Sequence, residues 1–170
     1  MNLQLIEFET LEDIENFQSK EKVSLTIGSF DAIHLGHQKL MQETIELAKK
    51  NKTIPALLTF KQHPRKTLNS EKSGATIFSY EHRLELITKF GIQKIFVIYF
   101  NETISHLTPI EFIQKILLKA LNCQAIITGE DNPPAQLLSK REHFQAMYFQ
   151  AKNKAAVFGH FCKDHSLRPE

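Results

Sequence analysis

The 170-residue sequence predicts an α/β fold, a doubly wound parallel sheet of about five strands arranged in three αβα layers. Short runs rich in β-branched and aromatic residues alternate with longer segments of helical period, which is the pattern of strands joined by crossover helices. The length is that of one ordinary domain, so we expect residues 1–170 to form a single domain. In such sheets ligands bind at the carboxyl ends of the strands.

Five segments are predicted as strands. The first ends immediately before Gly28, and the second is an apolar run suited to a buried central strand. The predicted strands are residues 23–27, 55–60, 94–100, 124–128 and 155–158. The loops that follow the first four are therefore the places where we expect function.

Four helices are predicted, and start and stop signals mark three of them. These signals are a lysine-rich end that suits the helix dipole, a serine cap with a later glycine, and a capping box that contains proline. The segments begin near Gly36 and end at Lys49–Lys52, begin at Ser79 and stop at Gly91, begin at Thr108-Pro109-Ile110-Glu111, and extend from about 136 to 153. A small extension around residues 10–19 precedes the first predicted strand.

Composition excludes several classes of function. The 21 basic and 19 acidic residues give a formal net charge of +2, which does not favour a nucleic-acid partner. The start of the chain lacks signal-peptide character, and apolar runs such as 95–100 are far too short to span a membrane. Cys123 and Cys162 form neither a disulfide framework nor a zinc quartet. We therefore expect a cytoplasmic protein with small-molecule partners; the oligomeric state is not predicted.

The loop after the first predicted strand carries the candidate chemistry, and it reads Gly28-Ser29-Phe30-Asp31-Ala32-Ile33-His34-Leu35-Gly36-His37. His34 and His37 are three residues apart at a helix start, so they project from one face beside free helix N–H groups that favour an anion. The glycines allow backbone to approach a ligand closely. A pair of surface histidines, or a metal site that includes Asp31, remains an alternative interpretation.

This loop resembles the His-x-Gly-His motif of the nucleotidyltransferase superfamily, whose fold is a Rossmann-like sheet. Two further segments resemble the FMN adenylyltransferase (FAD synthetase) module of the bacterial bifunctional riboflavin kinase/FMN adenylyltransferase family. They are Leu58-Thr59-Phe60-Lys61-Gln62-His63-Pro64-Arg65 and His106-Leu107-Thr108-Pro109-Ile110-Glu111-Phe112. The resemblance extends from about Val23 to Asp131, and no riboflavin kinase domain is expected within the 170 residues.

The resemblance implies transfer of AMP from ATP to FMN, with Mg²⁺ carried on the triphosphate and metal ligands unknown. Its motifs imply roles for three groups of residues. His34 and His37 would be catalytic; Gly28, Ser29, Phe30, Asp31, His34, Gly36 and His37 would bind the nucleotide; Thr59, His63, Pro64, Arg65 and Asp131 would form the flavin and phosphate side.

The sequence also departs from the family pattern. Ala32 replaces a usual glycine, the loop after Gly129 lacks the two aromatic residues of the family's Asp-Phe-x-Phe-Gly segment, and the later Ser-Ser-Thr-x-Ile-Arg motif has no counterpart. Two alternatives therefore remain open. One is a member that binds a nucleotide or a protein partner without turnover, and the other is a transferase with a different phosphorylated acceptor.

Overall fold

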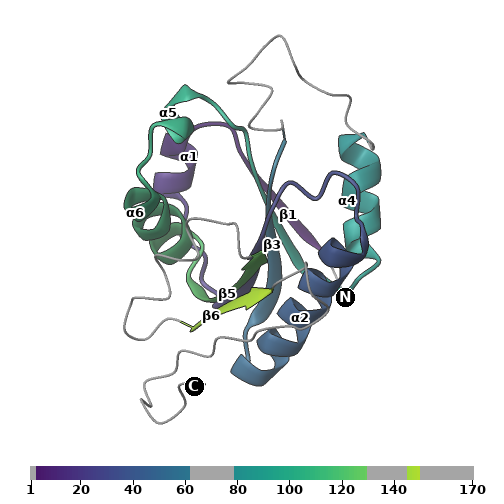
Figure 1. The fold of residues 1–170 in the computed structure, drawn as a ribbon. Helices are drawn as coiled ribbons and strands as arrows, with labels where there is room; N and C mark the ends of the chain where they lie inside the picture. The colour runs from purple at the N-terminus through teal and green to yellow at the C-terminus, as the bar shows by residue number, and fades with distance from the viewer. Residues whose placement is uncertain (1–2, 62–78, 130–144, 150–170) are drawn as a thin grey trace.

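Six parallel strands form one sheet in the computed structural model, which describes residues 3–61, 79–129 and, for the backbone alone, 145–149. Their order across the sheet is β1-β4-β3-β2-β5-β6, and each neighbouring pair is parallel (Figure 1). The strands are β1 (Gln4–Phe8), β2 (Val23–Ile27), β3 (Ile54–Phe60), β4 (Lys94–Ile98), β5 (Cys123–Gly129) and β6 (Gln145–Phe149). The predicted doubly wound α/β class is therefore confirmed.

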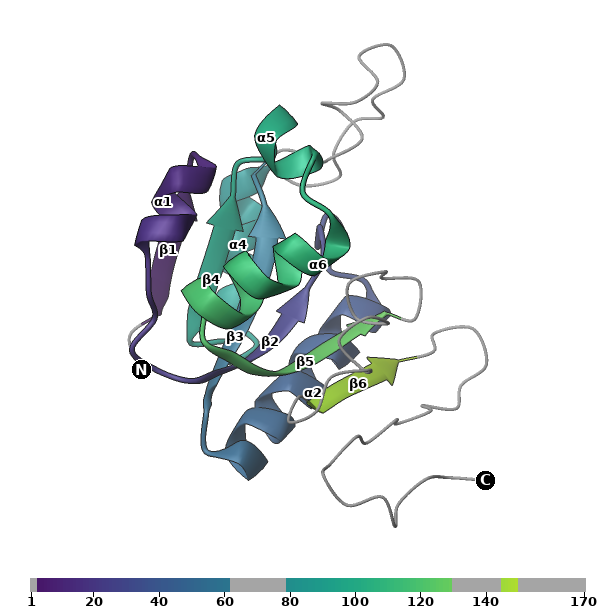
Figure 2. The same cartoon turned by 90° about the vertical axis from the view of Figure 1, so that its left-hand side faces the viewer.

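Helices cover both faces of this sheet. One face is covered by α2 and α4, and the other by α1 and α6 with its continuation η1, a π-helix (Figures 1 and 2). The helices are α1 (Leu11–Asn16), α2 (Leu35–Asn51), α4 (Tyr80–Thr88), α5 (Glu102–Ser105), α6 (Pro109–Glu111) and η1 (Phe112–Ala120). None of the helices described combines the length and the apolar composition that a bilayer crossing requires.

The hydrophobic core is divided by the sheet into two sides, because successive side chains of a strand point to opposite faces. On β4, Phe96 packs in the cluster beneath α1 and η1, whereas its neighbours Ile95 and Val97 pack in the cluster beneath α2 and α4. All three side chains are fully buried. Burial on both faces explains why this strand is a continuous apolar run and not an alternating one.

The strand order places a topological switch point beside β2. From β2 the chain proceeds through β3 to β4 on one side, and β5 and β6 lie on the other side. In open parallel sheets, the crevice at the carboxyl ends of the strands that flank such a point is the usual ligand site. The loop from Gly28 to His34 leaves β2 at this position.

The predicted cap signals are confirmed. Ser79 caps α4 with its hydroxyl, and Gly91 adopts a φ of +93° after the helix ends. Thr108 and Glu111 form the expected capping box, with Pro109 in the first turn. The first four predicted strands are also present, with bounds that differ by at most two residues.

The predicted helix at residues 136–153 is wrong where the structure describes it, because Gln145–Phe149 is the strand β6, paired in parallel with β5. The segment contains Tyr148 and Phe149, whose aromatic side chains favour strands. The edge of β5 supplies the backbone hydrogen-bonding partner of this strand. The periodicity of the segment itself cannot reveal such a distant partner. The remainder of that predicted helix, and the predicted strand at residues 155–158, lie outside the described residues.

A strand that the sequence did not indicate precedes the N-terminal extension. Thr10 and Asp13 form a capping box for α1, which lies within the predicted extension. The preceding strand, β1, joins the sheet at its edge beside β4. Phe8 is buried there, with its ring centroid 5.2 Å from that of Phe17 and 6.4 Å from that of Phe96.

We predict that Phe8→Ala destabilises the fold by about 3 kcal/mol, the usual cost of removing a buried aromatic ring. Leu5→Ala is the matched control, because Leu5 lies on the same strand and is 46% exposed. Urea unfolding followed by circular dichroism measures both. Equal stability losses in the two variants would contradict the packing of β1 through Phe8.

Candidate functional site

His34 is the N-cap residue of α2. Its Nδ1 atom accepts a hydrogen bond from the backbone N–H of His37, at 3.3 Å. When the ring is neutral, the accepting Nδ1 carries no hydrogen, so its proton is on Nε2. The exposed His34 ring therefore offers a donor beside the N-terminus of α2, where the N–H groups of Leu35 and Gly36 have no intrahelical acceptor.

His37 lies beneath His34 and is half-buried. The two imidazole rings stack with centroids 3.7 Å apart, and the Phe30 ring centroid is 4.8 Å from that of His37. Burial and the nearby His34 lower the pKa of His37 to about 4, against an opposing influence of Asp31. The His37 ring is consequently neutral near pH 7, and the site carries no fixed imidazolium at that position.

The loop between β2 and α2 is held in a constrained backbone conformation. Phe30 and Ile33 have positive φ angles of 53° and 40°, which non-glycine residues adopt at a cost of about 1–3 kcal/mol each. Both side chains are buried in the cluster that includes Met41 and Leu57. In addition, the Gln38 side chain donates to the Ile33 carbonyl at 3.0 Å. Packing thus fixes the loop that presents the histidines.

Two glycines make room for rings of this loop. A Cβ at Gly36 would lie 3.1 Å from two atoms of the His34 ring, and one at Gly28 would lie 3.2 Å from the Phe30 ring. The sequence predicts that these glycines allow a ligand to approach the backbone closely. The structure gives them, in addition, a packing role that sets the positions of His34 and Phe30.

Arg83 of α4 is a residue of this region that the sequence did not indicate. Its Nη1 donates to the carbonyl of Ser29 at 2.7 Å and to Oδ1 of Asp31 at 2.9 Å, and its Nη2 donates to the carbonyl of Phe60 at 3.0 Å. Its side chain is 5% exposed. The sequence offers one signal for Arg83: it is four residues before the apolar Ile87, so both lie on the same, buried side of α4. A charged side chain in a buried position requires partners.

The residues predicted for the flavin and phosphate side are only partly described. Thr59 is fully buried, and its hydroxyl donates to the Ser29 carbonyl at 3.1 Å, so it supports the loop after β2. The predicted residues His63, Pro64, Arg65 and Asp131 lie outside the described residues. The structure therefore brings together Gly28, Ser29, Phe30, Asp31, His34, Gly36, His37 and Thr59.

A second polar cluster adjoins the site where β1, β3 and β4 end. The ammonium of Lys61 bonds to the Tyr99 hydroxyl, lies 5.0 Å from the Tyr80 ring centroid, and is 3.8 Å from Glu7. The Tyr80 hydroxyl in turn donates to Glu7. These contacts hold the Lys61 side chain immediately after the end of β3.

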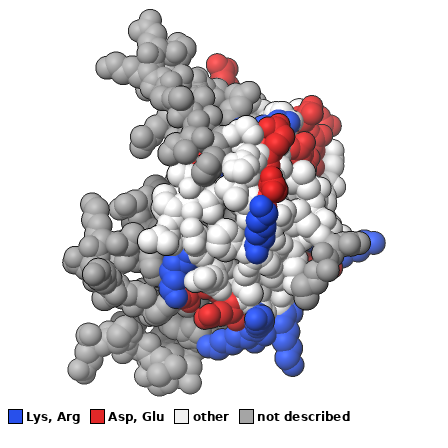
Figure 3. Space-filling view, turned by 90° about the vertical axis from the view of Figure 1, so that its right-hand side faces the viewer, with Lys and Arg blue, Asp and Glu red and all other residues white. Residues whose placement is uncertain are grey.

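The described residues contain no group of three His, Cys, Asp or Glu side chains that could hold a metal ion. Asp31, the acidic residue of the β2 loop, forms an ion pair with Arg83. Acidic and basic side chains both occur on the α4 side of the molecule, with uncharged residues between them (Figure 3). Among the described residues, the helix N–H groups and the imidazole donors are the groups that suit phosphate oxygens.

The fold and this loop define a parallel α/β domain with the start of α2 at the switch point of its sheet. The FAD synthetase family model matches residues 16–159. The chain therefore belongs to the FAD synthetase family.

Curated relatives of the chain are bifunctional riboflavin kinase/FMN adenylyltransferases. Those of Buchnera aphidicola (from Schizaphis graminum), Bacillus subtilis and Escherichia coli K12 are 35%, 30% and 27% identical over 71%, 67% and 66% of this chain. The matches cover 38%, 36% and 36% of those relatives, so the chain spans little more than a third of their length.

A solved structure shares the fold. The crystal structure of a macrolide-efflux protein from Streptococcus pneumoniae superimposes with a TM-score of 0.73 and 22% identity, covering 86% of this chain and 50% of that one. At this identity the likeness supports the fold alone.

The depressed pKa of His37 predicts a specific dependence of stability on pH. The unfolded chain takes up a proton at this residue near pH 6.5, whereas the folded protein does so only near pH 4. The free energy of unfolding should therefore fall as the pH decreases through this window, and His37→Gln should remove this part of the loss.

Urea unfolding at about pH 7 and about pH 4.5 tests this prediction. The control is His106→Gln, which replaces an exposed histidine at the end of α5 and should follow the wild type. If the wild type and His37→Gln lose the same stability between the two pH values, the buried neutral state of His37 is refuted.

Proposed function

We propose that the chain transfers the AMP group of ATP to the phosphate of FMN, giving FAD and pyrophosphate. The observation that carries this proposal is the stacked pair of His34 and His37 at the start of α2, beside the switch point of the sheet. Membership of the FAD synthetase family and relatives named FMN adenylyltransferases supply the acceptor.

In this reaction a phosphate oxygen of FMN forms a bond to the α-phosphorus of ATP. The bond from that phosphorus to the oxygen bridging to the β-phosphate breaks, and pyrophosphate leaves with the electron pair. No covalent intermediate with the protein is required. The protein contributes by positioning the two substrates and by stabilising the charge that develops on the leaving group.

The residues around α2 are suited to this task. The Nε2–H of His34 and the N–H groups of Leu35 and Gly36 would donate to phosphate oxygens, and the positive end of the helix dipole favours their charge. His37 supports His34 by ring stacking and by its backbone N–H, and it presents a second imidazole to the same ligand. Gly28, Ser29, Phe30 and Asp31 would line the nucleotide cleft.

The other predicted residues complete the proposal. Thr59, His63, Pro64, Arg65 and Asp131 would form the flavin and phosphate side, with Thr59 acting through the Ser29 carbonyl. Mg²⁺ would arrive bound to the triphosphate, because the described residues supply no cluster of metal ligands of their own. We further propose that the protein binds ATP and flavin in the cytoplasm.

The test is to incubate the protein with ATP, Mg²⁺ and FMN and to follow FAD by chromatography. His34→Ala and His37→Ala should each lower kcat/KM by roughly 10²–10³-fold, the effect of removing one donor to a developing oxyanion. Gln42→Ala, on the exposed face of α2, is the matched control and should keep the wild-type rate.

Two outcomes would overturn the proposal. Absence of FAD at high protein concentration would exclude the activity. Release of pyrophosphate with another phosphorylated acceptor but not with FMN would replace the acceptor. If both histidine variants kept the wild-type rate, the assigned role of the pair would be wrong even though the activity stood.

A further inference from the structure

Arg83 is the buried cation nearest to the proposed nucleotide loop, and the chemistry described above does not use it. It lies in the first turns of α4, and its guanidinium carbon is 5.6 Å from the Tyr80 ring centroid. Burying a charge costs several kcal/mol unless it is paired and hydrogen-bonded. The contacts of this buried arginine should therefore have a structural or functional role.

The guanidinium joins two segments that form different halves of the proposed site. Nη1 holds the carbonyl of Ser29 in the loop after β2, and Nη2 holds the carbonyl of Phe60 at the end of β3. The planar fork of arginine fixes the spacing and direction of these bonds, which the single ammonium of lysine cannot do. The Ser29 carbonyl also accepts from Thr59, so it is fixed from two sides.

Nη1 also donates to Asp31, which is one-quarter exposed and lies in the same loop as the two histidines. Without a cation beside it, a carboxylate here would repel the phosphate groups of a nucleotide. It would also favour the protonated form of His37, whose pKa Asp31 already tends to raise. The Arg83–Asp31 pair therefore keeps a negative charge of the loop compensated from inside the protein.

We infer that Arg83 is a positioning residue of the nucleotide site: it fixes the loop of Ser29 to Asp31 against the end of β3 and compensates the Asp31 charge. The inference rests on the proposed function for its consequence in catalysis. The hydrogen-bonding fork of the guanidinium and its positive charge can be tested separately. Arg83→Lys removes the fork and keeps the charge, whereas Arg83→Gln removes both.

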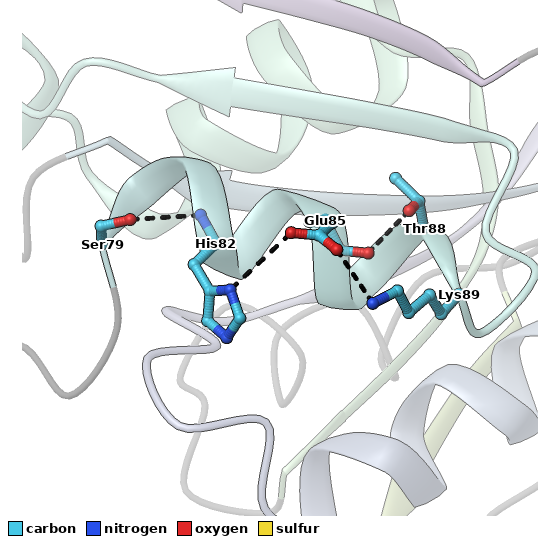
Figure 4. Close-up of polar contacts among 5 residues, drawn as sticks. All are labelled: Ser79, His82, Glu85, Thr88 and Lys89. Atoms are coloured by element: carbon cyan, nitrogen blue, oxygen red, sulfur yellow. Dashed lines mark hydrogen bonds and ion pairs between the residues drawn. The ribbon is translucent and has the colours of Figure 1, made fainter.

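The solvent face of the same helix provides the control. There Lys89 forms an ion pair with Glu85 at 2.9 Å, and His82 lies 3.8 Å from Glu85, with Ser79 capping the helix (Figure 4). The side chains of Lys89 and Glu85 are 61% and 60% exposed. Lys89→Gln thus removes a positive charge from α4 without touching the loop after β2.

The first experiment is an NMR titration of His37 in the protein without substrates. Arg83→Gln should raise the pKa of His37 by about half a unit or more, because Asp31 loses its ion pair with Arg83. The double variant Arg83→Gln/Asp31→Asn should return it towards the wild-type value, and Lys89→Gln should leave it unchanged. A wild-type titration of His37 in folded Arg83→Gln would overturn the charge compensation.

The second experiment compares ATP binding by calorimetry with the kinetics of FAD formation. Arg83→Gln should lower kcat/KM for ATP by about 10²-fold, the scale of a misplaced site. Arg83→Lys keeps the charge and loses the fork, so it should lower kcat while leaving the His37 titration close to wild type. Asp31→Asn added to Arg83→Gln should restore ATP affinity in part.

These readouts separate the inference from the proposed function. If the wild type forms no FAD, the proposed function fails, and the His37 titration and ATP binding still decide the role of Arg83. If the wild type forms FAD and folded Arg83→Lys matches its kcat, the positioning role of the fork is refuted. Circular dichroism shows whether each variant is folded. If Arg83→Gln does not fold, the kcat of Arg83→Lys tests the inference.

Discussion

Three hydrogen bonds from one buried guanidinium connect the loop after β2 to the rest of the domain. Arg83 reaches Ser29, Asp31 and Phe60, so a single side chain of α4 connects the loop, the end of β3 and the helix. Buried cations with fewer partners are costly, and breaking such a pair from one side typically costs about 3–5 kcal/mol. The interaction therefore joins the segments that form the site.

The histidine pair lies at the end of the same loop. His34 caps α2 with its ring and stacks on His37, which is neutral because it is half-buried against Phe30 and close to a second imidazole. Phe30 packs against His37 from a fully buried position with a positive φ angle. Sequence spacing placed the two histidines on one face of a helix; the structure adds that one of them is the cap of that helix.

Local signals were the predictable part of this protein. The caps at Ser79 and Thr108 are local because side chain and backbone partner are three residues apart. The strand β6 depends on pairing with β5, and the role of Arg83 depends on partners 23, 52 and 54 residues away. No local pattern carries such contacts, so the motif around the histidines was predictable and its internal support was not.

The inward direction of Arg83 and the neutral state of His37 have one consequence in common. A cation facing the ligand would attract bound ATP and departing pyrophosphate alike, and equal binding of ground state and transition state does not raise kcat. Neutral donors at a helix start act most strongly on charge that develops during the reaction. The guanidinium of Arg83 pairs with Asp31 and donates to backbone carbonyls, so it holds the loop from inside the protein. Its positive charge is therefore not presented to a ligand at the loop. Rigid placement of weak donors is thus the way in which this site would favour turnover over tight binding.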